Sequence, residues 1–213
     1  MNSTKKALLI GCGSKWGETF TKTIANSNYT IDLVTHSDFS YPNVNTVKID
    51  WHSISLNQIN EIIPLTDYNL IFFNHNSAGA VNDHWLKDGH TIPQELWNKS
   101  YWIDCQFPYY VIKHLNGNIR EDTKIGWMLT GLIVNRNSEH FKFAGYAASK
   151  SVNFHLMRGF SQVSNNGIYF AINPGRLIEN DHKKDSEDIL QVIEKITKLD
   201  SGKSFSKDGS VWM

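Results

Sequence analysis

Short, continuous apolar runs alternate along this chain with stretches in which apolar residues recur at helical spacing. Short apolar runs bounded by polar residues or glycine are typical of strands buried in a parallel sheet. Six such runs predict strands over residues 7–10, 29–36, 44–51, 70–73, 125–129 and 167–172.

Apolar residues at helical spacing fill the intervals between these runs. They predict helices over residues 18–25, 53–63, 94–115 and 146–163, and a last helix with the apolar stripe Ile189, Val192, Ile193 and Ile196. Pro108 is expected to kink its helix, residues 181–188 to form a charged, solvated loop, and residues 204–206 a small last strand. The alternation predicts an α/β fold: a doubly wound parallel sheet in a three-layer, Rossmann-like arrangement, as a single domain over residues 1–213.

The composition excludes several classes of protein. Lys+Arg and Asp+Glu both number 21, and this zero net charge argues against a general nucleic-acid binder. No apolar run reaches the length of a membrane span, and the N-terminus lacks the apolar region of a signal peptide. Cys12 and Cys105 form no CxxC pair, so neither a disulfide framework nor a metal site is expected. A cytoplasmic protein without nucleic-acid or membrane partners is expected.

A glycine-rich turn joins the first predicted strand to the first predicted helix. In the helix that follows, Phe20 and Ile24 lie one turn apart and suit a buried stripe. A strand, a glycine turn and a helix together present free backbone N–H groups to a phosphate. The candidate phosphate-binding residues are Gly11, Gly13, Ser14, Lys15, Trp16 and Gly17.

The end of the second predicted strand bears on the choice of dinucleotide. A dinucleotide-binding fold places the adenine ribose there, and an acidic residue selects the free 2′-hydroxyl of NAD. Here the strand ends at His36, and Asp38 comes slightly too late. The missing acid and Lys15 favour NADP over NAD. His36 is either a neighbour of the ribose or an ordinary surface histidine.

Two asparagines follow the fourth predicted strand. Asn74 and Asn76 lie just beyond it, where ligands bind in open α/β sheets.

Tyr146 and Lys150 are four residues apart in a predicted helix and share a face, so the ammonium could lower the pKa of the phenol and make it an acid/base. On spacing alone, an exposed Tyr and a solvated Lys are the commoner arrangement. Asp104 lies in an aromatic helix and could equally face solvent.

The order of these features resembles the short-chain dehydrogenase/reductase family, of the one-domain type, over nearly the whole chain. Besides the glycine turn and the Asn-rich turn, the chain has an acid after strand three and a hydroxyl residue after strand five. A Tyr-x-x-x-Lys helix and a Pro-Gly turn after strand six complete the series. The specific part is Tyr146 and Lys150 followed by Asn173, Pro174 and Gly175.

The resemblance implies a role for each matching residue. Tyr146 would be the catalytic acid/base, and Lys150 would bind the nicotinamide ribose and lower the pKa of the tyrosine. Asp50 would bind near the adenine. Asn74 or Asn76 would fall in the Asn-Asn-Ala-Gly turn of the family, with the register open by two residues. Pro174 and Gly175 would flank the nicotinamide.

Several positions depart from the pattern of the family. Its Gly-x-x-x-Gly-x-Gly turn fits Gly11, Lys15 and Gly17, with lysine for the middle glycine, or else Gly13 and Gly17, with Thr19 for the third. The first register is preferred because the following apolar residues then fall on packed positions. The serine of the family corresponds to Thr130, with Ser138 as a rival, and its helix asparagine to Asp104, which could hold a relay water. Residues 176–186 are polar and offer no apolar lid, so the site is open or is covered by a partner subunit.

These features imply an NAD(P)-dependent oxidoreductase, with NADP preferred, that interconverts a carbonyl and an alcohol of a small-molecule substrate. Thr130 would stabilise the oxyanion. Two alternatives stay open: a dinucleotide-binding sensor or regulatory subunit without redox turnover, and a lyase or epimerase that uses Tyr146 as a base. The family also implies a homodimer or homotetramer through the helices at 94–115 and 146–163, whose aromatic residues include Tyr109, Tyr110 and Phe154.

Overall fold

The computed structural model describes residues 4–51, 53–75, 93–130, 144–175 and 181–212, with only the backbone described for 144–146. Within these ranges, seven strands form one sheet in which every neighbouring pair is parallel. The strands are β1 (Lys5–Ile10), β2 (Tyr29–Thr35), β3 (Val44–Lys48), β4 (Leu70–Phe73), β5 (Lys124–Met128), β6 (Ile168–Asn173) and β7 (Lys203–Ser206). Their order is β3-β2-β1-β4-β5-β6-β7, which confirms the predicted doubly wound sheet.

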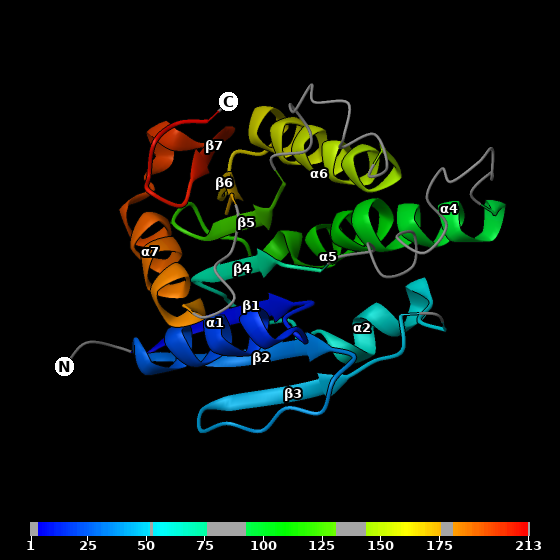
Figure 1. Ribbon diagram of the computed structural model, residues 1–213, viewed down its shortest axis with the longest axis horizontal. Helices are drawn as coiled ribbons and strands as arrows, with labels where there is room; N and C mark the ends of the chain where they lie inside the picture. The colour runs from blue at the N-terminus through cyan, green and yellow to red at the C-terminus, as the bar shows by residue number, and fades with distance from the viewer. Residues whose placement is uncertain (1–3, 52, 76–92, 131–143, 176–180, 213) are drawn as a thin grey trace.

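Helices cover both faces of this sheet (Figure 1). One face carries α1 (Lys15–Asn26) and α7 (His182–Lys195), and the other carries α2 (Ile59–Ile62), α5 (Phe107–Leu115) and α6 (Ala144–Val163). α4 (Gln94–Tyr101) continues into α5 through η3 (Trp102–Gln106), a π-helical turn. Short 3₁₀ turns in the described ranges are η1 (Leu56–Gln58), η4 (Asn116–Asn118) and η7 (Lys198–Asp200). In the described part of the chain, we find no helix with the length and apolar character that a membrane crossing requires.

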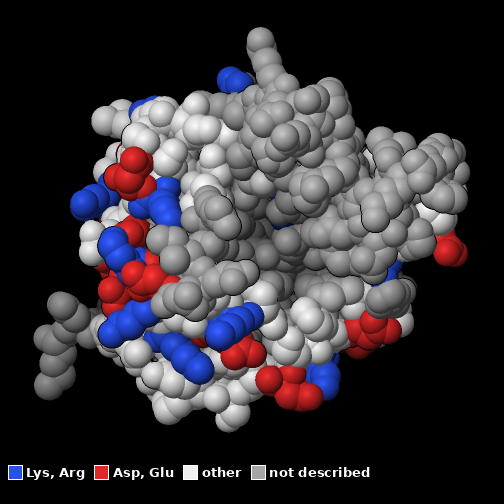
Figure 2. Space-filling view, viewed as in Figure 1, with Lys and Arg blue, Asp and Glu red and all other residues white. Residues whose placement is uncertain are grey.

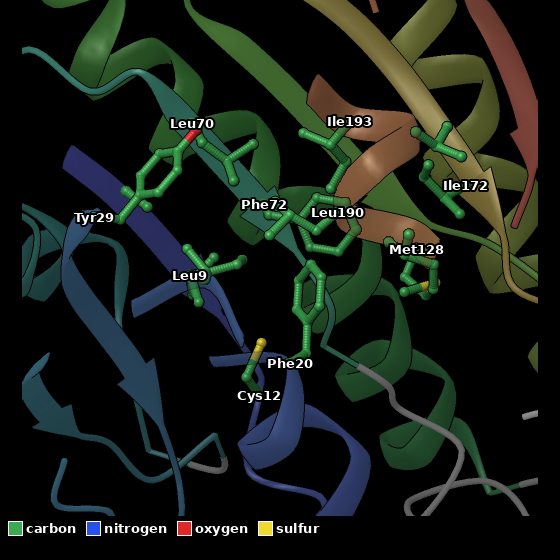
Figure 3. Packing of buried hydrophobic residues seen from close by; sticks show 14 of the residues in the cluster. Leu9, Cys12, Phe20, Tyr29, Leu70, Phe72, Met128, Ile172, Leu190 and Ile193 are labelled. Atoms are coloured by element: carbon green, nitrogen blue, oxygen red, sulfur yellow. The ribbon is translucent and has the colours of Figure 1, made fainter. Parts of the chain in front are cut away.

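The sheet separates two hydrophobic cores, because successive side chains of a strand point to opposite faces. In β1, Leu9 packs with α1 and α7, whereas Leu8 and Ile10 pack with α2, α5 and α6. Figure 3 shows the first core, in which the rings of Phe20 and Phe72 lie with their centroids 5.2 Å apart. This packing holds the start of α1 against the carboxyl ends of the central strands.

The start of α1 differs from the prediction and is set by a cap. The helix begins at Lys15 rather than at residue 18, because the Ser14 hydroxyl oxygen accepts a hydrogen bond from the Gly17 N–H at 3.1 Å. A serine in this position satisfies one of the donors that every helix start leaves unpaired. The second half of the glycine-rich turn is therefore the first turn of the helix.

The predicted solvated loop over residues 181–188 is wrong. Asp181 caps α7 by accepting a hydrogen bond from the Lys184 N–H at 3.2 Å, and the helix begins at His182. Asp185 is buried and forms an ion pair with Lys207, with 2.7 Å between the carboxylate oxygen and Nζ. The charged sequence concealed the helix because its other charged side chains lie on the outer face.

The irregularity predicted at Pro108 lies one turn earlier. Pro108 is the second residue of α5, but the helix runs on from η3 through helical backbone at Gln106, so the missing N–H and the proline ring disturb the turn before it. The disturbance in this long helix is the π-helical turn η3, which contains Asp104. Such turns widen a helix by an extra residue and are frequent at functional sites.

Candidate functional site

The carboxyl ends of the parallel strands gather the predicted site residues at one edge of the sheet. The arrowheads of β1 to β4 point to this edge in Figure 1. The glycine turn follows β1, His36 follows β2, Asn74 follows β4 and Thr130 lies just beyond β5. In open α/β sheets this edge is where ligands bind.

The glycine turn is closely packed against neighbouring backbone. Gly11 has a φ of +80°, and a Cβ atom there would lie 2.2 Å from the Cα of His75. A Cβ on Gly17 would lie 2.7 Å from the backbone of Cys12, so this glycine lets α1 approach the turn. These two positions are the first and third glycines of the preferred register. The turn therefore requires glycine at both for its own packing.

The N-terminus of α1 is suited to bind an anion. The first intrahelical bond runs from Glu18 N–H to Ser14 carbonyl, so the N–H groups of Lys15 and Trp16 point out of the helix. Lys15 is exposed beside them. The Trp16 side chain is buried and stacks on Phe20 at 5.0 Å, so only its backbone is placed for a ligand.

The end of β2 is locked to the glycine turn. Ser37 donates a hydrogen bond from its hydroxyl to the Gly13 carbonyl oxygen at 3.0 Å, and a Cβ on Gly13 would lie 2.5 Å from that hydroxyl oxygen. His36 is exposed next to this contact. Asp38, the nearest acid after β2, forms an exposed ion pair with Lys48 at 2.7 Å. The Asp38 carboxylate is thus engaged away from the turn.

A groove of about 470 Å³ lies near Asp50, beyond the end of β3. It separates the segment that follows Asp50 from α4 and η3. Its lining residues are Trp51, Ile54, Ser55, Leu56, Glu95, Lys99 and Trp102. Asp50 itself is exposed.

The end of β4 carries one predicted residue and one that the sequence reasoning missed. The backbone N–H of Asn74 donates to the Ile10 carbonyl at 2.8 Å and thereby ties the β4 end to β1. His75 follows it and is 2% exposed. Its backbone carbonyl oxygen accepts a hydrogen bond from Lys150 Nζ at 2.6 Å. Asn76 lies outside the described residues.

Lys150 and Asp104 lie inside the protein, so the surface interpretation of each is wrong. Lys150 is 2% exposed and Asp104 is 0% exposed. The Oδ1 atom of Asp104 lies 3.6 Å from Lys150 Nζ and 3.6 Å from Nε2 of His75. Three elements therefore bring one ammonium, one carboxylate and one imidazole together. The backbone of Tyr146 is in α6, one turn before Lys150, and its side chain lies outside the described atoms.

The protonation of this cluster follows from its burial. Burial lowers the pKa of His75 to about 3, with the Lys150 charge acting in the same direction and the Asp104 charge opposing it. His75 is therefore neutral at neutral pH. Burial also lowers the pKa of the Lys150 ammonium, and the Asp104 carboxylate opposes that shift. Each effect is the expected response of a cationic group to a dry environment.

The remaining predicted residues lie at the ends of β5 and β6. Thr130 is half-buried and follows Leu129, whose N–H donates to the Ile172 carbonyl at 2.8 Å. The Asn173 side-chain oxygen accepts a hydrogen bond from the Gly175 N–H at 3.1 Å and so shapes the Pro174 turn. Ser138, the rival of Thr130, lies outside the described residues.

The charges on the described surface are mixed in sign. On the face drawn in Figure 2, Lys and Arg side chains alternate with Asp and Glu side chains along one side. Among the residues that the structure describes, no three His, Cys, Asp or Glu side chains gather as a metal site would require.

No protein-family model matches this chain, and no curated protein sequence matches it. Solved structures do match. A carbonyl reductase from Pseudomonas aeruginosa PAO1 in complex with NADP has a TM-score of 0.80 over 98% of this chain and 99% of its own, at 11% identity. A short-chain dehydrogenase/reductase (glucose/ribitol dehydrogenase) from Brucella melitensis has a TM-score of 0.74 over 99% and 98%, at 12% identity. The chain therefore has the short-chain dehydrogenase/reductase fold.

Proposed function

We propose that this chain is a short-chain dehydrogenase/reductase that uses NADP, or less readily NAD, to interconvert a carbonyl and an alcohol. The observation that carries the proposal is the buried Lys150, one helical turn after Tyr146, which His75 and η3 hold just below the ligand-binding edge of the sheet. A solvated surface lysine would need neither burial nor these partners. Fold similarity alone would not support an activity.

The residues at this edge fit a dinucleotide. The outward N–H groups at the start of α1 would bind its phosphates, and Lys15 would lie beside them. Pro174 and Gly175 would flank the nicotinamide, and Asp50 would bind near the adenine. When bound, the reduced nicotinamide supplies the hydride for the carbonyl carbon.

The protein's own residues would handle the proton and the developing charge. Tyr146 would donate its phenolic proton to the carbonyl oxygen as the hydride arrives, and it would accept that proton in the reverse reaction. The Thr130 hydroxyl would donate a hydrogen bond to the same oxygen. The Lys150 ammonium would lower the pKa of Tyr146 and bind the nicotinamide ribose.

The preference for NADP rests on charge at the end of β2. No carboxylate directly follows that strand, Asp38 is paired with Lys48, and Lys15 is exposed at the helix start. A cationic side chain there would stabilise a 2′-phosphate, whereas an acid would bind the free ribose hydroxyls of NAD. Exposed His36 would lie beside the same ribose.

Lys15→Glu should therefore weaken NADP binding about ten-fold more than NAD binding, because the reversed charge would repel the 2′-phosphate in addition to the phosphates that both dinucleotides carry. Isothermal titration calorimetry with both dinucleotides measures this. Lys22→Glu makes the same charge change on an exposed residue of α1 and serves as the control. Equal affinity of the unmodified protein for NADP and NAD would contradict the preference.

A dinucleotide-binding protein without redox turnover is the main alternative. Lysine in place of the middle glycine, threonine for serine and aspartate for asparagine all support it. Calorimetric binding of a dinucleotide, with no oxidation or reduction across a broad carbonyl panel, would favour this alternative. A lyase or epimerase would instead form product with only catalytic amounts of cofactor.

A homodimer or homotetramer through α4–α5 and α6 is also proposed, on the support of aromatic surface. Tyr109 is 41% exposed on α5. The prediction that Phe154 offers surface to a partner is wrong, because it is 8% exposed and packs in the core. A monomer in gel filtration at micromolar concentration would contradict this assembly.

A further inference from the structure

Lys150, Asp104 and His75 form a buried cluster below the ligand-binding edge. Lys150 comes from α6, Asp104 from the π-helical turn η3, and His75 from the residues after β4. None of the three is more than 2% exposed. The Asp104 carboxylate lies between the other two, 3.6 Å from the ammonium and 3.6 Å from the imidazole.

An ammonium in this position needs a compensating charge. Moving a charged group out of water costs several kcal/mol even after the protein relaxes, and an unpaired buried lysine loses its proton instead. The His75 carbonyl oxygen provides a hydrogen bond at 2.6 Å but no charge. Asp104 provides the charge, and its effect on Lys150 opposes that of burial.

Among the residues that the structure describes, the other ionisable groups near the cluster do not supply this charge. His75 is neutral, and Trp51 and Phe73 pack against its ring at 6.4 and 5.9 Å. Neither ring nitrogen of His75 has a hydrogen-bond partner among the described residues. Burial raises the pKa of the half-buried Cys105 beside Asp104, and it raises that of Cys12 in the glycine turn to about 12. Both thiols therefore stay neutral near pH 7.

We propose that Asp104 is a positioning residue whose carboxylate is the counter-ion of Lys150. It keeps Lys150 protonated and fixed against the end of β4, and His75 is a neutral neighbour that adds no charge. The asparagine that the family resemblance leads one to expect at this position could hold a water but could not balance the charge. The inference rests on the proposed function for the purpose of the ammonium. The ion pair itself can be tested without any dinucleotide.

The first test is the thermal stability of Asp104→Asn without ligand. A lysine whose pKa is lowered by folding binds its proton more weakly in the folded than in the unfolded state. That difference lowers stability below the unfolded pKa, about 10.4, and the loss disappears as pH rises. Without Asp104, folding lowers the pKa of Lys150 further, so the loss of stability is greater. The Tm of Asp104→Asn should fall on the order of 10 °C below wild type at pH 7, and the gap should narrow towards pH 10.

Asp185→Asn is the matched control. It removes another buried carboxylate from an ion pair, but its partner Lys207 is 28% exposed, so water can solvate that ammonium. Its Tm gap from wild type should stay constant between pH 7 and pH 10. A constant gap for Asp104→Asn as well would overturn the inference.

Two more variants keep the inference testable if Asp104→Asn unfolds. Adding Lys150→Met to Asp104→Asn removes both charges and should recover most of the lost Tm, because an uncompensated charge is the costly element. A double variant as unstable as Asp104→Asn would overturn the inference. His75→Phe keeps a ring of similar shape, and its Tm gap should not change with pH. If the Tm gap of His75→Phe narrowed towards pH 10, as for Asp104→Asn, the assignment of His75 as a neutral neighbour would be overturned.

NADPH binding separates this inference from the proposed function. In Asp104→Asn the NADPH Kd should rise about ten-fold more between pH 6 and pH 9 than in wild type, because Lys150 loses its charge over that range. Parallel pH curves for the two proteins would contradict the inference. If wild type bound no NADPH while the Tm gaps between the variants and wild type behaved as expected, the proposed function would fail and the ion-pair assignment would stand.

Discussion

Tyr146→Phe should lower the rate of carbonyl reduction about 10³-fold and leave NADPH affinity within about two-fold of wild type. The substitution removes only the phenolic oxygen, so the proton for the carbonyl oxygen would have to come from water. Lys150 would keep its contacts with His75 and Asp104, because neither involves the tyrosine. The cofactor site would stay intact while the chemical step fails.

Steady-state kinetics and calorimetry measure the two parts of this result. Tyr109→Phe is the matched control, since it removes the same oxygen from a tyrosine that is 41% exposed on α5. That control should retain full activity. If Tyr146→Phe remained active, Tyr146 would not be the catalytic acid. If it lost NADPH binding as well, the loss of activity would not identify a chemical role.

Gly11→Ala should lower the free energy of unfolding by about 4 kcal/mol, or Tm on the order of 10 °C. Alanine is strained at a φ of +80°, and its Cβ would meet the His75 backbone at 2.2 Å. Neither Gly11 nor His75 can move freely, because the pairing of β1 with β4 extends to Ile10 and Phe73, shortly before this contact. The displaced His75 carbonyl would also release Lys150, so activity should fall further than stability explains.

Gly175→Ala separates the two causes of that loss. Gly175 also has a positive φ, +61°, but no atom of the described residues lies within 4 Å of an added Cβ. It should therefore cost only the backbone strain, about 1 kcal/mol. Chemical denaturation of both variants measures the difference. Equal losses would show that the close approach of Gly11 to His75 is unimportant.

The fold was predictable because its signals are local. The run 70–73 matches β4 residue for residue, since a fully buried parallel strand is apolar throughout. Helices at the surface were harder to recognise. The charges in 181–188 suggested a loop, whereas the buried Asp185 depends on Lys207, which is distant in sequence.

The candidate site was predictable only in part, because its roles depend on packing between distant segments. Tyr146 and Lys150 are conspicuous by spacing, but the burial of Lys150 follows from β4 and η3. Pro108 predicted a disturbance in this helix, but nothing in the sequence predicted its form, a π-helical turn. His75 gave only a positional signal, as a polar residue just after a buried strand. Its contact with Gly11 appears only when β1 and β4 are paired.

The most direct test of the central claim is the transfer of deuterium from NADPH labelled at nicotinamide C4. Wild-type protein would be incubated with each of the two labelled stereoisomers and a panel of small carbonyl compounds, and the alcohols analysed by mass spectrometry. We expect one deuterium per molecule of product, bound to the new carbinol carbon, from one stereoisomer only. Two results would contradict the assignment as a carbonyl–alcohol oxidoreductase. One is NADPH binding with no label transferred to any compound, and the other is a hydrogen on the carbinol carbon that comes from water alone.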